Sequence, residues 1–164
     1  MPLTLSIEVL YAESRVAREA WLDDLREVLL EEMRSAECVA DVAEKGGEAD
    51  LWLSVSVSEC SLEHGEGGEP YLDENSGRYR PGRSYLCRIT LAYALLPDPD
   101  GEPLHTDGFT VAQREGTTSN PLFEPREHAY RRAMVQTARE LRRHTCKRLP
   151  KIAKLLDRSA ETSR

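Results

Sequence analysis

Three stretches of the chain alternate apolar and polar residues with a period of two, and this pattern constrains the fold more than any other feature. It runs through residues 3–9, 49–58 and 85–95. A strand that is buried on both faces reads as a continuous apolar run, whereas alternation is typical of a strand with one buried and one open face. The three stretches therefore predict a sheet that is covered mainly on one side.

Two further segments show the three- and four-residue spacing of amphipathic helices. The first has Ser14 as its N-cap and an apolar stripe that continues to about Ala36. The second starts at about Pro125, a residue that suits a first helical turn, and is expected to end near Arg148 because Pro150 follows. Two helices are enough to cover one face of a four- or five-stranded sheet.

Two shorter strands complete the predicted order. Residues 38–42 read as a short strand, and the turn signal at residues 97–102 returns the chain through a strand over residues 104–113. The sequence thus predicts an α/β (α+β) two-layer sandwich: a mixed sheet of four to five strands, two amphipathic helices on one face, and the order β-α-β-β-β-β-α.

The chain has 164 residues, which is the size of one domain with a real core. We expect a single domain over residues 1–149, a long loop at 61–83 and a polar basic tail at 150–164. No segment is apolar enough to cross a bilayer. The first residues lack the charged and apolar regions of a signal peptide, which predicts a cytoplasmic protein, or a periplasmic or outer-membrane-associated one if a leader has been removed.

The layout resembles an α/β domain that several bacterial envelope accessory proteins share. The resemblance lies in the alternating strand at 49–55, the hairpin turn at 98–102 and the closing helix containing residues 127–134. Members of this group are the TolB N-terminal domain, the lipopolysaccharide-assembly lipoprotein LptE, the activator LpoB and the CsgG-type secretion lipoproteins. The resemblance implies a non-enzymatic domain that binds another protein within a larger assembly.

The second face of the predicted sheet is the first candidate site. Its positions carry small side chains where a solvated face more often has Thr, Lys, Glu or Arg. A flat strip of this kind lets another surface approach closely, and Trp and Arg are enriched as anchors at interfaces. The alternatives are that a second copy or the chain's own 61–83 loop covers the face, or that it is a thinly decorated face in contact with water. The residues expected to bind a partner here are Trp52, Ser54, Ser56, Arg88, Thr90 and Ala92.

The predicted loop at 61–83 is the second candidate. It displays Tyr71, Tyr79, Arg80 and Arg83, which belong to the residue types that carry binding energy. A disordered surface loop explains the same Gly- and Glu-rich sequence, and we favour that interpretation over a binding loop.

Charge is distributed unevenly along the chain. Residues 1–78 carry 19 acidic and 6 basic side chains, whereas residues 126–164 carry 12 basic and 4 acidic ones. We expect the acidic and basic elements to pack side by side. The alternative is that the basic helix binds nucleic acid or another anion, but aromatic residues for stacking are missing and the acidic remainder repels phosphates.

No catalytic, cofactor or metal motif stands out in the sequence. The four histidines are scattered, and the pair Cys60 and His64 lacks a second pair of zinc ligands. The four cysteines are expected to be reduced and structural.

We therefore predict a non-enzymatic adaptor, without cofactor or metal, that binds another protein or a second copy of itself. The alternatives are a small cytoplasmic enzyme with residues 61–83 as a lid over a deep pocket, and an anion- or nucleic-acid-binding module.

Overall fold

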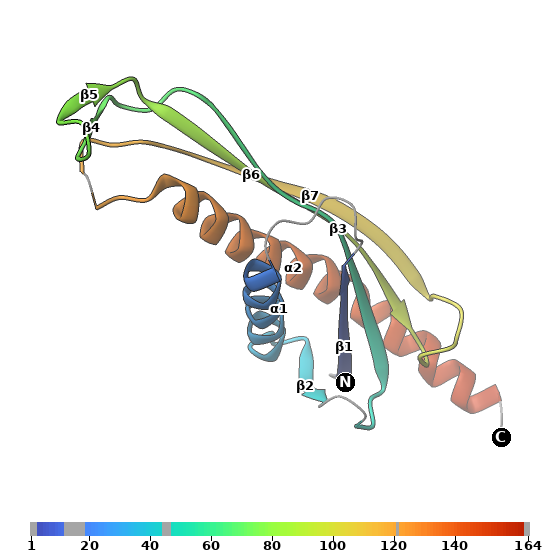
Figure 1. Cartoon of the computed structure of the whole chain (residues 1–164). Helices are drawn as coiled ribbons and strands as arrows, with labels where there is room; N and C mark the ends of the chain where they lie inside the picture. Colours follow the sequence, from blue (N-terminus) through green and yellow to red (C-terminus); the bar gives the residue numbers. More distant parts are fainter. Residues whose placement is uncertain (1–2, 12–18, 44–46, 121, 163–164) are drawn as a thin grey trace.

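The computed structural model describes residues 3–11, 19–43, 47–120 and 122–162. The strands are β1 (Leu3–Tyr11), β2 (Val39–Ala43), β3 (Leu51–Glu66), β4 (Tyr71–Asp73), β5 (Arg78–Arg80), β6 (Arg83–Leu96) and β7 (His105–Gly116). The helices are α1 (Glu19–Arg34) and α2 (Pro125–Thr162). All five predicted strands and both predicted helices are present (Figure 1). The N-cap predicted at Ser14 lies outside the described residues.

Five strands form one mixed sheet in the order β2-β1-β3-β6-β7. β1 lies between β2 and β3 and is parallel to both, while β3, β6 and β7 follow one another in antiparallel pairs. The parallel connection from β1 to β2 needs a crossover, which α1 supplies. The predicted mixed sheet is confirmed.

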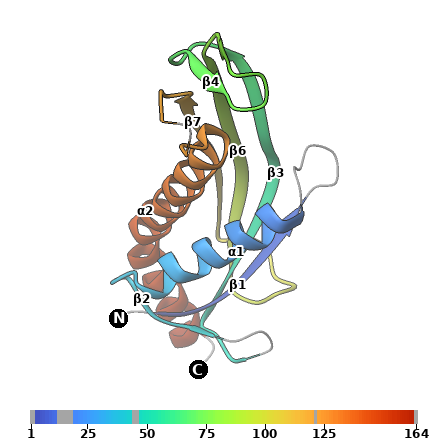
Figure 2. The ribbon, with the colours of Figure 1, turned by 60° about the vertical axis from the view of Figure 1, so that its left-hand side comes forward.

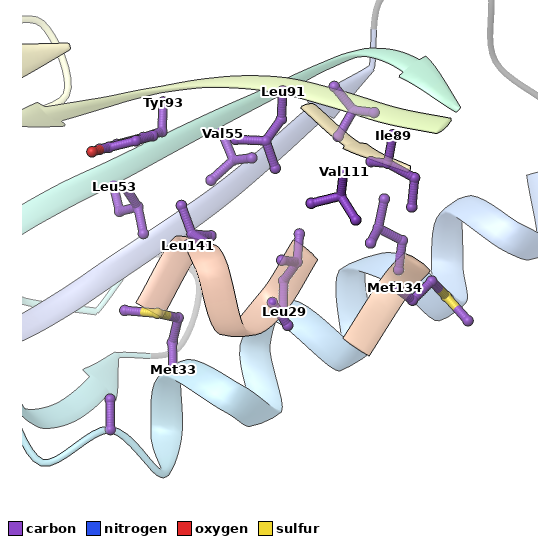
Figure 3. Packing of buried hydrophobic residues seen from close by; sticks show 14 of the residues in the cluster. Leu29, Met33, Leu53, Val55, Ile89, Leu91, Tyr93, Val111, Met134 and Leu141 are labelled. Atoms are coloured by element: carbon purple, nitrogen blue, oxygen red, sulfur yellow. The ribbon is translucent and has the colours of Figure 1, made fainter. Parts of the chain in front are cut away.

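Both helices cover the same face of this sheet, which gives two layers (Figure 2). Figure 3 shows Leu29 of α1 and Leu141 of α2 beside Val55 and Leu91 of the sheet. All four side chains are at most 1% exposed. Burying each such side chain stabilises the fold by about 1.5–3 kcal/mol. The alternating positions on β3 and β6 thus build the core, as the sequence predicts.

The alternation on β3 changes phase at a β-bulge. Val57 pairs with Leu91 but Glu59 pairs with Thr90, so one extra residue stands on β3. Odd-numbered residues face the core before the bulge, whereas after it the even-numbered Cys60 is buried. The bulge lets β3 continue to Glu66 with its less polar positions still directed inward.

The prediction of an irregular loop over residues 61–83 is wrong. β3 continues to Glu66 and pairs there with Arg83, the first residue of β6. Between them, β4 and β5 form a two-stranded hairpin that turns at Gly77, whose φ is +66°. Strand pairing with β6 overrides the low strand propensity of the Gly- and Glu-rich segment. We call residues 67–82 the tip. Figure 1 shows it at the upper left end of the sheet, away from the two ends of the chain.

The predicted end of the second helix at Arg148, with a polar tail from residue 150, is also wrong. α2 continues through Pro150 to Thr162. A proline inside a helix costs about 3 kcal/mol. Leu149 and Ile152 are each only 3% exposed, and their burial is large enough to offset that cost. Neither α1 nor α2, the two helices of the described residues, is apolar enough to cross a bilayer.

Two of the four cysteines are joined, which corrects the expectation that all are reduced. Cys38, between α1 and β2, forms a disulfide with Cys146 in the middle of α2. The two cysteines are 108 positions apart, so the bond ties the first third of the chain to the last helix. Cys60 and Cys87 are buried free thiols. Hydrogen bonding with Cys60 and burial both raise the pKa of Cys87.

Candidate functional site

The sheet surface that faces away from the two helices is the largest candidate site, and we call it the open face. The six residues predicted for it lie on this same face of the adjacent strands β3 and β6. Ser54 pairs with Ala94 and Ser56 with Ala92. The neighbouring strands extend the same surface with small side chains that sequence reasoning missed. These are Ser6 on β1 and Thr106, Gly108, Thr110 and Ala112 on β7.

Hydroxyl groups on the open face bond within the face itself. Thr90 Oγ1 and Thr110 Oγ1 lie 2.9 Å apart across β6 and β7, and Ser58 Oγ donates to the carbonyl oxygen of Thr90 at 3.4 Å. These two contacts join β6 to β7 and β3 to β6. The centre of the open face on β3, β6 and β7 is therefore flat, because it is lined by small side chains, and Glu8 and Leu10 of β1 border it beside Ser54 and Ser56.

The two predicted anchors lie at opposite ends of the open face. Trp52 pairs with Leu96, and eight residues separate Leu96 from Arg88 along β6. At about 3.3 Å per residue this is about 26 Å. Arg88 is held by Glu63, whose carboxylate lies 3.6 Å from its guanidinium. Trp52 and Arg88 therefore frame the flat centre and do not form a single cluster.

The four remaining predicted residues belong to the tip and its base, away from the flat centre. Tyr71 lies on β4, and Tyr79 on β5 is 76% exposed. Arg80 binds Asp73 across the hairpin at 2.6 Å, and Arg83 begins β6. The backbone N–H of Asn75 and the Arg80 guanidinium lower the pKa of Asp73. Nine residues of β6, about 30 Å, separate Arg83 from Ala92.

Thr117, just after β7, fastens the tip to the sheet. Its hydroxyl donates to the carbonyl oxygen of Glu69 at 2.7 Å and accepts from the backbone N–H of Arg83 at 3.0 Å. Its backbone N–H donates to the carbonyl oxygen of Arg83 at 2.8 Å. Gly68, with φ +80°, makes this crossing possible, because a Cβ there would lie 2.6 Å from the same carbonyl oxygen. The tip is thus bonded to the sheet at its base.

The hollow beside the tip is where the lid hypothesis places a deep pocket. Glycine and proline make up most of its lining, and it is open to solvent where β3 ends and β6 begins. The polar side chains that line it are His64, Glu66 and Arg83. Within the described ranges, no group of three His, Cys, Asp or Glu side chains could hold a metal ion.

Two histidines that looked scattered in the sequence come together between β7 and α2. His144 lies 3.7 Å from Asp107 and 3.7 Å from Glu140, and Tyr93 bonds to His105 at 3.3 Å. The pKa of Asp107 is lowered, mainly by the hydrogen bond from the backbone N–H of Gly108. Burial opposes this shift, and the nearby charges of His144, His105 and Arg148 add to it. Burial raises the pKa of Tyr93. The sequence signal for this cluster was the odd-numbered positions of β7, which face α2.

The basic side chains of α2 are the third predicted candidate. Among the described residues, one ion pair joins the acidic first half of the chain to this helix, between Glu32 and Arg142 at 2.9 Å. Arg132 instead pairs with Glu115 on β7. From Arg131 to Lys151 the helix carries eight basic residues and one acidic residue. The predicted side-by-side packing of opposite charges therefore compensates only part of this charge.

Several solved structures share the fold. A DUF330 protein from Xanthomonas campestris has a TM-score of 0.64 and 17% identity over 94% of this chain and 89% of its own. A predicted neuraminyllactose-binding hemagglutinin homologue from Helicobacter pylori has a TM-score of 0.58 and 14% identity over 98% of this chain and 90% of its own. A predicted lipoprotein from Caulobacter crescentus has a TM-score of 0.52 and 18% identity over 88% of this chain and 90% of its own. No family model and no curated protein sequence matches this chain. At these identities the likeness shows the fold.

Proposed function

We propose that this chain is a non-enzymatic accessory protein of a bacterial envelope assembly and that its open face binds another protein. The open face itself carries the proposal. Both helices lie on the opposite side of the sheet (Figure 2). On the open face, Thr90 and Thr110 bond to each other through their hydroxyl groups, and Ser58 bonds to the backbone of Thr90. A flat surface of this kind can meet a partner closely without first displacing long, flexible side chains, whose ordering costs free energy.

The size of the open face fits such a role. The four longest strands of the sheet, at about 4.8 Å spacing and about 12 residues of length at 3.3 Å each, give an area of up to about 760 Å². One partner contributes roughly 800 Å² to a protein–protein interface of standard size. Trp52 at one end and Arg88 at the other belong to the residue types that carry binding energy. We therefore place the binding energy at the two ends and close contact at the centre.

Two observations support an envelope location. The disulfide between Cys38 and Cys146 is of the kind that persists in oxidising compartments such as the periplasm. Among the proteins that share the fold is a predicted lipoprotein of Caulobacter crescentus. The closer resemblance to TolB-, LptE-, LpoB- or CsgG-type domains stays a prediction, as does the identity of the partner.

Site-specific photo-crosslinking in the native host tests the proposal. A photo-reactive residue replaces Ser56 on the open face, Tyr79 on the tip, or Glu102 in the hairpin turn as the control. Crosslinked products are identified by mass spectrometry from separated soluble and membrane fractions. We expect one dominant protein from Ser56 that is absent from Glu102, and its fraction reports the compartment.

The variant Ser54→Arg/Ala92→Arg decides whether the open face is responsible. It places two long charged side chains on adjacent strands of the face and should abolish the Ser56 crosslink and the affinity for the purified partner. Glu102→Arg adds the same net charge away from the face and should leave both unchanged. The absence of any Ser56 product in both fractions would refute the proposal. If Ser56 crosslinks only to a second copy of the chain, the open face mediates self-assembly and does not bind a different protein.

A further inference from the structure

β7 is an edge strand whose outer side meets no other strand of the described residues. It pairs with β6 over twelve residues without a register shift, and it contains no proline. Long, regular edges of this kind are templates for adding another strand, and proteins usually protect them with bulges, prolines or charges. The outer edge of β7 is therefore protected neither by a bulge nor by a proline.

The direction of the edge groups follows from one hydrogen bond. Thr117 N–H donates to the carbonyl oxygen of Arg83 beyond the Ser84–Gly116 pair, which makes that pair a non-hydrogen-bonded one. The alternation of an antiparallel ladder then turns the N–H and C=O groups of the even-numbered residues of β7 away from β6. These residues are Thr106, Gly108, Thr110, Ala112, Arg114 and Gly116.

A charge closes the first half of this edge. Asp107 Oδ1 accepts a hydrogen bond from the backbone N–H of Gly108 at 2.8 Å, so that outward donor is already satisfied. His144 lies 3.7 Å from the same carboxylate and helps to hold it in place. Beyond Asp107, the described residues offer no comparable cover to the donors of Thr110, Ala112 and Arg114. We call residues 110–114 the free edge.

Basic side chains of α2 lie beside the free edge. α2 runs antiparallel to β7, since His144 contacts Asp107 at one end and Arg132 binds Glu115 at the other. A hollow of about 300 Å³ lies along this side. It is lined by Gln113, Arg131, Arg132, Val135, Gln136 and Arg139, with no carboxylate among them. Val135 is 41% exposed and supplies an apolar contact.

We propose that the free edge takes up an extended acidic segment of a partner protein as a sixth strand of the sheet. The backbone of the segment bonds to the outward groups of Thr110, Ala112 and Arg114. Every second side chain then lies on the helix side, where Arg131 and Arg139 favour carboxylates. The side chains between them extend the open face and can be small or apolar. Backbone bonds supply affinity and the alternating charges supply specificity.

A second copy of this chain fits the free edge less well. Antiparallel pairing of two β7 strands would bring the two α2 helices to the same side of a continuous sheet, with their arginine rows facing each other. Like charges placed opposite one another across an interface oppose association. The proposal concerns the backbone groups along the outer edge of β7, whereas the open face is a surface of side chains, and it stands whether or not the open face binds a partner.

Selection from a display library tests the proposal on the full chain. The library holds nine-residue segments with Glu or Asp at every second position and random residues between them. Enriched peptides are synthesised with blocked ends, and their affinity is measured by fluorescence anisotropy. A second set carries N-methyl groups on the amides of alternate residues, which removes strand pairing on one side and leaves the protein untouched. Two versions of each peptide are made, one methylated at the odd-numbered amides and one at the even-numbered amides. We expect one of the two versions to bind at least tenfold more weakly than the unmethylated peptide.

Two protein variants with matched controls separate strand pairing from charge. Ala112→Pro removes an outward N–H without breaking a bond to β6 and should weaken binding at least tenfold, whereas Ala112→Val keeps the donor and should not. Arg139→Glu should weaken binding similarly, while Arg158→Glu, near the end of the same helix, should not.

Three outcomes would overturn the proposal. The first is the lack of any enrichment over the Ala112→Pro protein. The second is peptide binding that Arg139→Glu weakens but that neither N-methylated version changes. Such a result would mean that charge attraction alone holds the peptide, without strand addition. The third is a concentration-dependent dimer in sedimentation that Ala112→Pro abolishes, because a second copy would then occupy the free edge. None of these readouts depends on the open face, so Ser54→Arg/Ala92→Arg serves as a further control and should bind the peptides normally.

Discussion

Removing the disulfide between Cys38 and Cys146 should destabilise the protein strongly. A disulfide stabilises a fold mainly by restricting the unfolded chain, and the restriction grows with the length of the closed loop. The two cysteines are 108 positions apart, and a loop of about 100 residues corresponds to roughly 4.7 kcal/mol. Both sites are half-buried, so serine fits them at little further cost. We expect Cys38→Ser/Cys146→Ser to lower the free energy of unfolding by about 3–5 kcal/mol.

Urea denaturation of the oxidised protein and of the double variant measures this difference. With a slope of about 2 kcal/mol per molar urea, the midpoint should fall by about 2 M. Reduced wild-type protein is the matched control. Once a reductant is present its midpoint should coincide with that of the double variant, because both then have an unrestricted unfolded chain.

Two results would refute this reasoning. One is a double variant that unfolds within about 1 kcal/mol of the oxidised wild type, which would mean that the bond does not restrict the unfolded chain as its long loop requires. The other is four free thiols in denatured protein that was purified under alkylating conditions from the native host, because the bond would then not form in the cell. That second result would also remove one of the two supports for an envelope location.

The remaining predictions concern the tip, the start of α1 and the buried thiols. Gly68→Ala should cost about 2 kcal/mol or more in thermal or urea unfolding, and clearly more than Gly77→Ala, since both glycines have positive φ but only Gly68 lies against other backbone atoms. Burial raises the pKa of Tyr11 from 10.0 to about 12, and its hydroxyl donates to the carbonyl oxygen of Leu22 at 2.5 Å. Stability from this neutral group is complete below pH 10 and is lost as pH rises towards 12, so Tyr11→Phe should make the fall in that window shallower; an unchanged slope would contradict the assignment. Cys60 and Cys87 should react with a thiol reagent only as fast as the protein opens, and rapid reaction in native buffer would argue against their burial.

The local pattern of the sequence was enough to determine the five strands of the main sheet, the two helices and the side of the sheet that the helices cover, but not the extension of β3, the strands β4 and β5, or the end of α2. Alternation at period two marks the buried face of a strand from its own residues, as at Leu53 and Val55, and no knowledge of the neighbouring strands is needed. The same reasoning placed Ser54, Ser56 and Ala92 on one open face, where they lie. It did not extend that face to Thr110 and Ala112 of β7.

Contacts between distant parts of the chain decided everything that the pattern did not show. The bulge after Val57 changes which residues of β3 face inward, because the pairing with β6 must absorb one extra residue. The tip is ordered by Thr117, 34 positions beyond Arg83, to which it bonds. Pro150 remains helical because its neighbours are buried against the rest of the fold. None of these contacts has a signature within a short window of sequence.

The candidate sites divide in the same way. The open face is a property of single strands, so the sequence alone determined most of it. The free edge is a property of the sheet order, because β7 has an unpaired side only if no other strand is placed beside it. The disulfide likewise needs α1 and α2 to pack together before Cys38 can meet Cys146. Periodicity is local and is written in the chain, whereas pairing partners are chosen by the free energy of the whole fold, and only the tertiary structure reveals them.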